Sequence, residues 1–234
     1  MVASRAQSAA AVAPARAVWL DARGLQQGFK AHAGRGIGTY LASLAGALDP
    51  EAGPGRVGYV VERDAELTHA LAPARLVIAP RARPGHGRLA TQLHQHLQLA
   101  AWLSAKRPAA VHFPAQTDAP ALLAVRSIVT VHDVVLHRHG AWYATHAGDD
   151  LASRAARARF RTMRLLERLA IAHASRVIVP SRVTARELEE TLGVARGRIT
   201  VIPLAAPARF TDVASAGDAT VRARLRLPER YVLH

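Results

Sequence analysis

Short apolar runs alternate with longer amphipathic stretches along this chain, and the alternation predicts β-α units that share a parallel sheet. Seven runs have the length and composition of buried strands, and they lie at 17–20, 57–61, 75–79, 109–113, 127–131, 176–179 and 199–202. The predicted fold class is therefore α/β, with a Rossmann-like parallel sheet flanked by helices.

Four longer stretches between these runs carry apolar residues at helical spacing, and they lie at 38–48, 89–105, 149–172 and 181–192. In the second stretch, one face is predicted to hold Leu89, Leu93, Leu97, Leu99 and Leu103. The first helix is expected to end at Asp49-Pro50. Ser181 is a suitable N-cap for the fourth helix, and Gly193 is its C-terminal stop.

Changes in composition divide the chain into four parts. Residues 1–16 are rich in Ala and Ser and lack the apolar core that a signal peptide has, so a disordered tail is expected. Residues 17–207 form the predicted Rossmann-like domain. The small, polar residues 208–227 predict a linker with a short helix at 221–225. An apolar run then opens within 228–234, and we interpret it as the start of a further, truncated domain.

The net charge of +14 has two interpretations. A polyanionic partner would explain it, whether nucleic acid, an anionic membrane or a phosphorylated substrate. A compositional bias would explain it as well, because 29 of the 31 basic residues are arginine and alanine is abundant. Only Phe160 interrupts the densest basic stretch, whereas nucleic-acid binding favours interleaved aromatic rings. We therefore expect no nucleic-acid partner. The absence of cysteine excludes disulfides and thiolate metal sites.

A glycine-rich loop follows the first predicted strand and contains Gly36 and Gly38. Glycines let the backbone approach a ligand, and the next helix offers free N–H groups and a positive dipole end to an anion. A tight turn would explain the same glycines, and the dinucleotide fingerprint G-x-G-x-x-G is absent.

The predicted strand at 127–131 runs directly into His132-Asp133. Ligands of open α/β sheets bind at the carboxyl ends of strands, so His132 could bond a sugar hydroxyl or a phosphate. The alternative is a capping aspartate beside a structural histidine. The pairs His94/His96 and His137/His139 lack converging acidic or thiolate ligands, so no metal site is predicted.

Taken together, these segments resemble the N-terminal domain of glycosyltransferase family 4, including its mannosyltransferase-like branch. The matching segments are 20–23 (LDAR), 36–40 (GIGTY), 127–133 (SIVTVHD), 174–188 (ASRVIVPSRVTAREL) and 192–202 (LGVARGRITVI), and 227–233 resembles the start of the family's second domain.

The resemblance implies the N-terminal half of a GT-B fold and a retaining transfer of a hexose from a nucleotide-sugar donor to a glycan or lipid-linked acceptor. It implies no cofactor and no essential metal. His132 and Asp133 are the implied catalytic residues, and the implied substrate-binding residues are Arg23, Arg35, Gly36, Gly38, Thr39 and Ser181. The family's C-terminal domain is missing, so the chain is expected to be inactive unless a partner chain supplies that domain.

Two further hypotheses stay open. In one, the chain is a non-catalytic module that binds a glycan or an anionic membrane, which its basic charge would favour. In the other, ranked last, it binds nucleic acid. No run reaches the ~18 uncharged apolar residues of a membrane helix. We expect a cytoplasmic protein, with peripheral contact at the inner face of a membrane as an open alternative.

Overall fold

The structure is a computed structural model. It describes residues 4–5, 17–29, 36–51, 53, 55–81, 94–140, 142, 154–206, 217–228 and 230. The chain forms two compact units, residues 1–204 and residues 205–234.

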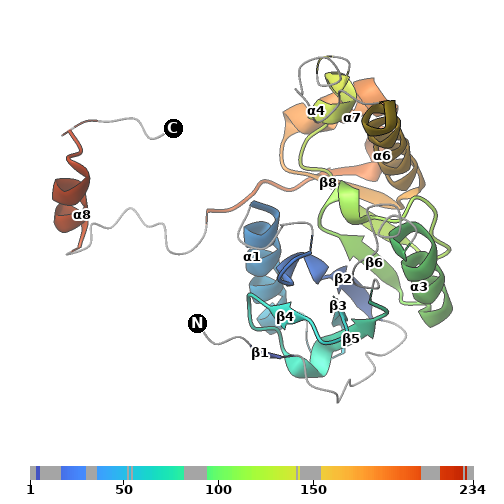
Figure 1. The fold of residues 1–234 in the computed structure, drawn as a ribbon, viewed down its shortest axis with the longest axis horizontal. Coiled ribbons are helices and arrows are strands. Elements are labelled where there is room, and N and C mark those ends of the chain that lie inside the picture. The colour runs from blue at the N-terminus through green and yellow to red at the C-terminus, as the bar shows by residue number, and fades with distance from the viewer. Residues whose placement is uncertain are drawn as a thin grey trace. The chain divides into compact units, whose positions relative to one another are not determined.

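Seven parallel strands form the sheet of the first unit, which confirms the predicted fold class (Figure 1). They are β2 (Val18–Asp21), β3 (Val57–Glu62), β5 (Leu76–Ala79), β6 (Ala110–Phe113), β7 (Ser127–Thr130), β8 (Arg176–Val179) and β9 (Ile199–Val201). Their order is β5-β3-β2-β6-β7-β8-β9, and every neighbouring pair is parallel. All seven carboxyl ends therefore lie at the same edge of the sheet.

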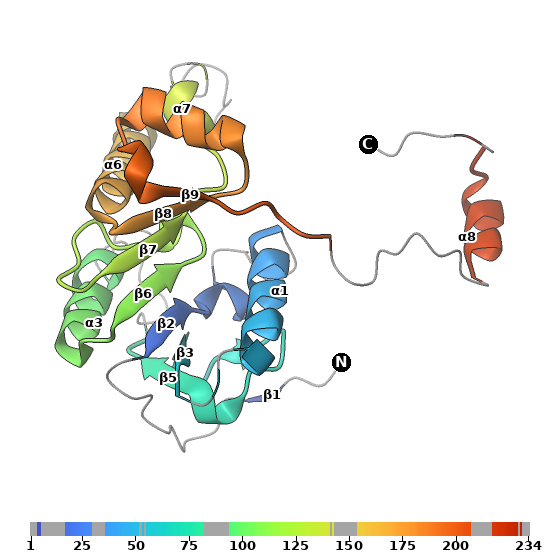
Figure 2. The same cartoon turned by 180° about the vertical axis from the view of Figure 1, so that it is seen from behind.

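Helices cover the two faces of this sheet, and they are α1 (Gly36–Glu51), α3 (Ala100–Lys106), α6 (Arg154–His173) and α7 (Arg182–Leu192). Successive strand residues point to opposite faces, so each face has its own hydrophobic cluster. One cluster contains Leu103 of α3, Ile171 of α6 and Leu188 of α7. The other joins Leu41 of α1 to Leu20 of β2. Figures 1 and 2 show α1 on one side of the sheet and α3 on the other.

In the described part of 89–105, the structure differs from the single helix that the sequence predicts. Residues His94–Leu99 form a π-helical segment, η3, that leads into α3. Leu99 and Leu103 are buried as predicted, but Leu97 is 61% exposed, so its placement on the buried face was wrong. The hydrogen bonds of a π-helix join residues five apart, which changes the phase of the faces. Leu89 and Leu93 lie outside the described residues.

The observed boundaries of two other helices can be compared with the predicted ones. Helix α1 begins at Gly36 and continues through Asp49-Pro50 to Glu51, so its predicted end was too early. A proline in the last turn removes a single backbone hydrogen bond, which a helix end tolerates. Helix α7 agrees with the prediction at both ends, with Ser181 as its N-cap and Gly193 as its C-cap.

Short elements complete the described chain. They are β1 (Ser4–Arg5), η1 (Arg23–Leu25), β4 (Glu66–Leu67), η2 (Pro73–Arg75), η4 (Gln116–Asp118), α4 (Val135–Arg138) and η6 (Arg196–Arg198), and in the second unit α8 (Asp218–Leu225). Within the predicted tail, β1 pairs antiparallel with β4. The other tail residues lie outside the described part. No described helix combines the length and apolar composition that crossing a membrane requires.

The end of α7 provides a test of this fold. Gly193 has a φ of +67°, a left-handed conformation that glycine adopts without the steric cost of a β-carbon. We expect Gly193→Ala to lower the free energy of unfolding by about 1 kcal/mol. Gly197→Ala is the matched control, because a β-carbon at Gly197 meets no atom within 4 Å and its φ is not positive. Equal stabilities of the two variants in urea denaturation would contradict the expectation.

Candidate functional site

The carboxyl edge of the sheet gathers the segments that the sequence singled out. Strand β2 ends at Asp21, two residues before Arg23, and β7 leads into His132-Asp133. Strand β8 leads to Ser181 at the start of α7. Because all these strands are parallel, their following loops lie at one edge, where ligands of open α/β sheets bind.

Side chains of α1 and β7 meet at this edge. The Tyr40 ring lies edge-on against the His132 ring, with centroids 5.1 Å apart and planes at 86°. The Tyr40 hydroxyl approaches the Thr130 hydroxyl at 3.4 Å. Tyr40 ends the segment that contains Gly36 and Gly38. The structure therefore brings the predicted glycine segment and the predicted histidine together.

The ring of His132 also contacts the backbone that follows β6. Its Nε2 lies 2.8 Å from the carbonyl oxygen of Pro114, which follows β6. A carbonyl oxygen only accepts, so Nε2 carries a proton, and in the neutral ring Nδ1 is then the acceptor nitrogen. The half-buried His132 side chain can thus accept a hydrogen bond from a hydroxyl group.

Asp133 is exposed and has a capping role in the structure. Its Oδ1 accepts a hydrogen bond from the Val135 N–H at 3.1 Å, at the start of α4. The side chain of Gln116 donates to the Asp133 carbonyl at 3.1 Å. These two contacts fix the backbone that carries His132. A catalytic role for Asp133 stays a prediction.

The described glycine segment forms the first turns of α1. Gly36 is exposed, and a β-carbon there would meet no atom within 4 Å. Gly38 is buried and Thr39 is half-buried. The first N–H groups of a helix have no intrahelical partner, so this end of α1 can donate to a ligand at the edge. Arg35 lies outside the described residues.

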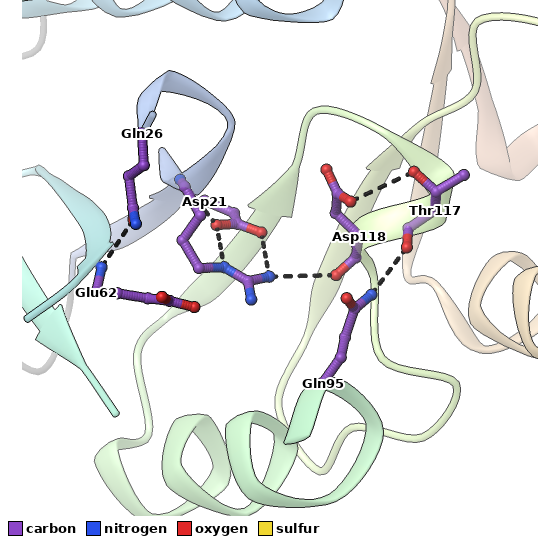
Figure 3. A network of polar contacts seen from close by, with 7 residues as sticks. Asp21, Gln26, Glu62, Gln95, Thr117 and Asp118 are labelled. Carbon is purple, nitrogen blue, oxygen red and sulfur yellow. Dashed lines mark hydrogen bonds and ion pairs between the residues drawn. The ribbon is translucent and has the colours of Figure 1, made fainter. Parts of the chain in front are cut away.

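The side chain of Arg23 is buried in the protein. Figure 3 shows the polar network that contains its partner Asp21. Arg23 is 1% exposed, and its guanidinium forms a bidentate ion pair with Asp21, at 2.8 Å from Nε to Oδ1 and 2.7 Å from Nη2 to Oδ2. Nη2 also lies 3.5 Å from the carbonyl oxygen of Asp118. The predicted contact of Arg23 with an acceptor or a phosphate has no geometric support, because its charge is already paired.

Burial affects the acid–base groups of this network in opposite ways. Desolvation acts to lower the pKa of Arg23, but the adjacent Asp21 carboxylate outweighs it, and the pKa lies above its ordinary value. Desolvation raises the pKa of Glu62, whose backbone N–H donates to Gln26 Oε1 at 2.8 Å. The network therefore ties the end of β2 to the end of β3.

Ser181 serves as a helix cap. Its Oγ accepts a hydrogen bond from the Thr184 N–H at 3.0 Å and lies 3.0 Å from Thr184 Oγ1. The interpretation of Ser181 as a cap is therefore confirmed, and a ligand contact stays a prediction.

The histidine pairs have separate partners within the protein. Nδ1 of His94 bonds Gln98 Oε1 at 2.9 Å, whereas Nδ1 of His96 accepts from the Ala121 N–H at 3.0 Å. His137 Nε2 lies 3.1 Å from the buried carboxylate of Glu167. In the described part of the chain, no three His, Asp or Glu side chains are grouped as a metal site requires.

His112 belongs to the site but was not singled out from the sequence. It lies on β6, and its Nε2 is 2.8 Å from Thr130 Oγ1, the hydroxyl that Tyr40 also approaches. Desolvation, and to a lesser degree the charge of His132, lower the pKa of His112 to about 4. The sequence does not show that His112 belongs to the site, because a histidine inside a short apolar run can be either a core residue or a site residue.

The pKa of His112 predicts how stability changes with pH. Between its folded value of about 4 and the ordinary 6.5, the unfolded chain binds a proton that the folded chain does not. Its stabilising contribution is therefore complete above pH 6.5 and is lost as the pH falls toward 4. Between pH 7.5 and 4, we expect the free energy of unfolding of the wild type to fall by on the order of 3 kcal/mol more than that of His112→Gln. Urea unfolding at the two pH values measures both. Parallel losses in the two proteins would refute this.

The buried ion pair predicts a large effect of removing one charge. Arg23→Gln leaves the Asp21 carboxylate buried without its cation, which should cost about 3–5 kcal/mol of unfolding free energy. The matched control is Arg126→Gln, since Arg126 is exposed and no contact of its side chain is seen among the described residues. The double variant Asp21→Asn/Arg23→Gln should recover part of the loss. A small effect of Arg23→Gln would show that the pair contributes little.

Comparisons with known proteins place this chain in a family. The sequence model of the family described as Glycosyltransferase Family 4 matches residues 34–207, about three quarters of the chain. Among solved structures, the chain is similar to Anabaena Alr3699/HepE in complex with UDP and glucose, with 14% sequence identity and a TM-score of 0.48. It is also similar to Anabaena Alr3699/HepE in complex with UDP, with 14% sequence identity and a TM-score of 0.49. Each comparison covers 90% of this chain and 50% of the other, so the chain spans about half the length of those structures. A comparison with curated proteins finds no match. On the match of its family model, the chain belongs to glycosyltransferase family 4.

Proposed function

We propose that this chain is the acceptor-side, N-terminal domain of a retaining glycosyltransferase. The transferase moves a hexose, with mannose as the first candidate, from a nucleotide-sugar donor to a glycan or lipid-linked acceptor. The observation that supports the proposal is the meeting of Tyr40, Thr130 and His132 at the carboxyl edge of the sheet. Membership of glycosyltransferase family 4 supports the same proposal.

The site chemistry favours hydroxyl groups over charged ones. His132 offers an acceptor nitrogen, Asp133 an exposed carboxylate and the start of α1 a set of N–H donors. Sugar hydroxyls both donate and accept hydrogen bonds, so they can use all three. This composition fits an acceptor sugar or the hexose being transferred.

The described residues of the site offer fewer contacts for the diphosphate of a donor. The departing nucleotide develops negative charge, and cations or N–H groups aimed at it stabilise the transition state. Arg23 is paired with Asp21 and faces the interior. We propose that a second domain supplies most of the donor contacts, and that the 234-residue chain alone does not transfer sugar.

A non-catalytic role on an anionic membrane is the second candidate. The side of α6 that faces solvent carries Arg154, Arg161 and Arg168, with Leu165 55% exposed among them. Arginines flanking an apolar side chain are typical of helices that lie on anionic lipid. Co-sedimentation with anionic vesicles that weakens with salt and with Arg168→Gln would favour this role.

Transfer assays test the first proposal. We expect the chain alone to release no nucleotide from UDP-glucose or GDP-mannose in the presence of sugar acceptors. Joined to a second domain that restores turnover, His132→Ala should lower kcat/KM by about tenfold or more, because a hydrogen bond to the sugar is lost.

His139→Ala is the control for this experiment, because His139 is exposed and lies just beyond α4. Gly38→Val should also lower transfer, since its side chain would occupy space at the start of α1. Robust turnover by the chain alone would contradict the proposed need for a second domain. Unchanged kcat/KM in His132→Ala would remove His132 from the site.

A further inference from the structure

A groove lies between α7 and the edge strand β9. Its volume is about 350 Å³, and its lining residues are Arg182, Ala185, Arg186, Glu189, Arg196, Ile199 and Val201. Strand β9 is the last in the order of the described strands, so its outer edge has no described neighbour. Tyr40 and Thr130 belong to α1 and β7, and neither lines this groove.

Three arginines converge on the groove from two elements. Arg182 and Arg186 are four residues apart on α7 and so share one side of the helix. Arg196 comes from η6, at the amino end of β9. All three side chains are exposed, and none makes an ion pair or hydrogen bond with another described residue.

Neighbouring arginines show that this lack of partners is a local property. Arg138 pairs with Glu187 on the same helix α7 at 2.9 Å. Arg198, two residues from Arg196, donates to the carbonyl oxygens of Ile171 and Ala174 at the end of α6. The arginines that tie elements together thus have partners, whereas the three in the groove have none among the described residues.

The charges and shape of the groove indicate its ligand. Three arginines and the single carboxylate of Glu189 leave two positive charges, which complement a dianion. Guanidinium groups match phosphate oxygens in a bidentate fork. The apolar floor of Ala185, Ile199 and Val201 lowers the local dielectric and strengthens these contacts.

We propose that the α7–β9 groove binds a phosphate-bearing ligand, with Arg182, Arg186 and Arg196 as its phosphate contacts. The ligand is either a soluble diphosphate compound or the phosphate of a lipid headgroup. The proposal does not depend on the proposed glycosyl transfer, because it uses none of the residues at the carboxyl-edge site.

Binding of inorganic pyrophosphate to the 234-residue chain tests the proposal by titration calorimetry at constant ionic strength. We expect saturable binding that Arg186→Gln weakens by about tenfold or more, because one charge-assisted contact is lost. Glu189→Gln should bind more tightly than the wild type, because the one opposing charge is removed. Far-UV circular dichroism checks that each variant is folded.

Arg126→Gln is the matched control, because it removes the same charge from an exposed position outside the groove. Its affinity should stay within about twofold of the wild type, since a distant exposed charge is screened. Equal weakening by Arg126→Gln and Arg186→Gln would overturn the proposal, because binding would then follow only the net charge.

Vesicles distinguish the two sources of phosphate. Co-sedimentation is compared between phosphatidylglycerol-containing vesicles and pure phosphatidylcholine vesicles. Binding to the anionic vesicles that is lost in Arg186→Gln and kept in Arg126→Gln assigns the groove to a lipid phosphate. Pyrophosphate binding without vesicle binding assigns it to a soluble ligand. If neither probe binds in a manner sensitive to Arg186, the proposal is wrong.

Discussion

Parallel pairing of all seven strands is the constraint on which the site depends. Each strand must be followed by a crossover before the next can pair, so every carboxyl end lies at the same edge. Residues far apart in sequence, such as Tyr40 and His132, then meet at this edge. Pro114, at the end of β6, completes the arrangement by accepting from His132.

Buried charge at the end of β2 determines which part of this edge can meet a ligand. Arg23 and Asp21 are desolvated together, and such a pair is tolerated because its two hydrogen bonds have good geometry. The guanidinium of Arg23 is bound to the carboxylate of Asp21, so it is not available to bind a phosphate. Thr130, His132 and Asp133, two strands along, are left with neutral hydrogen-bonding groups and one carboxylate. The edge is therefore divided into a part where the charges are paired and buried, and a part with an exposed carboxylate and a half-buried imidazole.

The sequence predicted the strands well because each is a short apolar run bounded by turn residues. It also predicted the cap of Ser181 and the stop at Gly193, since both depend on local backbone chemistry. It did not predict the outward turn of Leu97, which follows from a π-helical hydrogen-bond pattern. Nor did it predict the partner of Arg23 or the burial of His112, because the direction of a side chain depends on contacts with distant residues.

The arginines illustrate why net charge alone describes this protein poorly. Arg23 is neutralised internally, Arg198 holds the carbonyl end of α6, and Arg138 joins α4 to α7. A charge that is already paired adds little to the field felt by a ligand, since its partner cancels it at a distance. Only unpaired arginines close to one another can favour a phosphate over other anions. Among the described residues that line the α7–β9 groove this condition is met, and at the carboxyl edge, where Arg23 is paired, it is not.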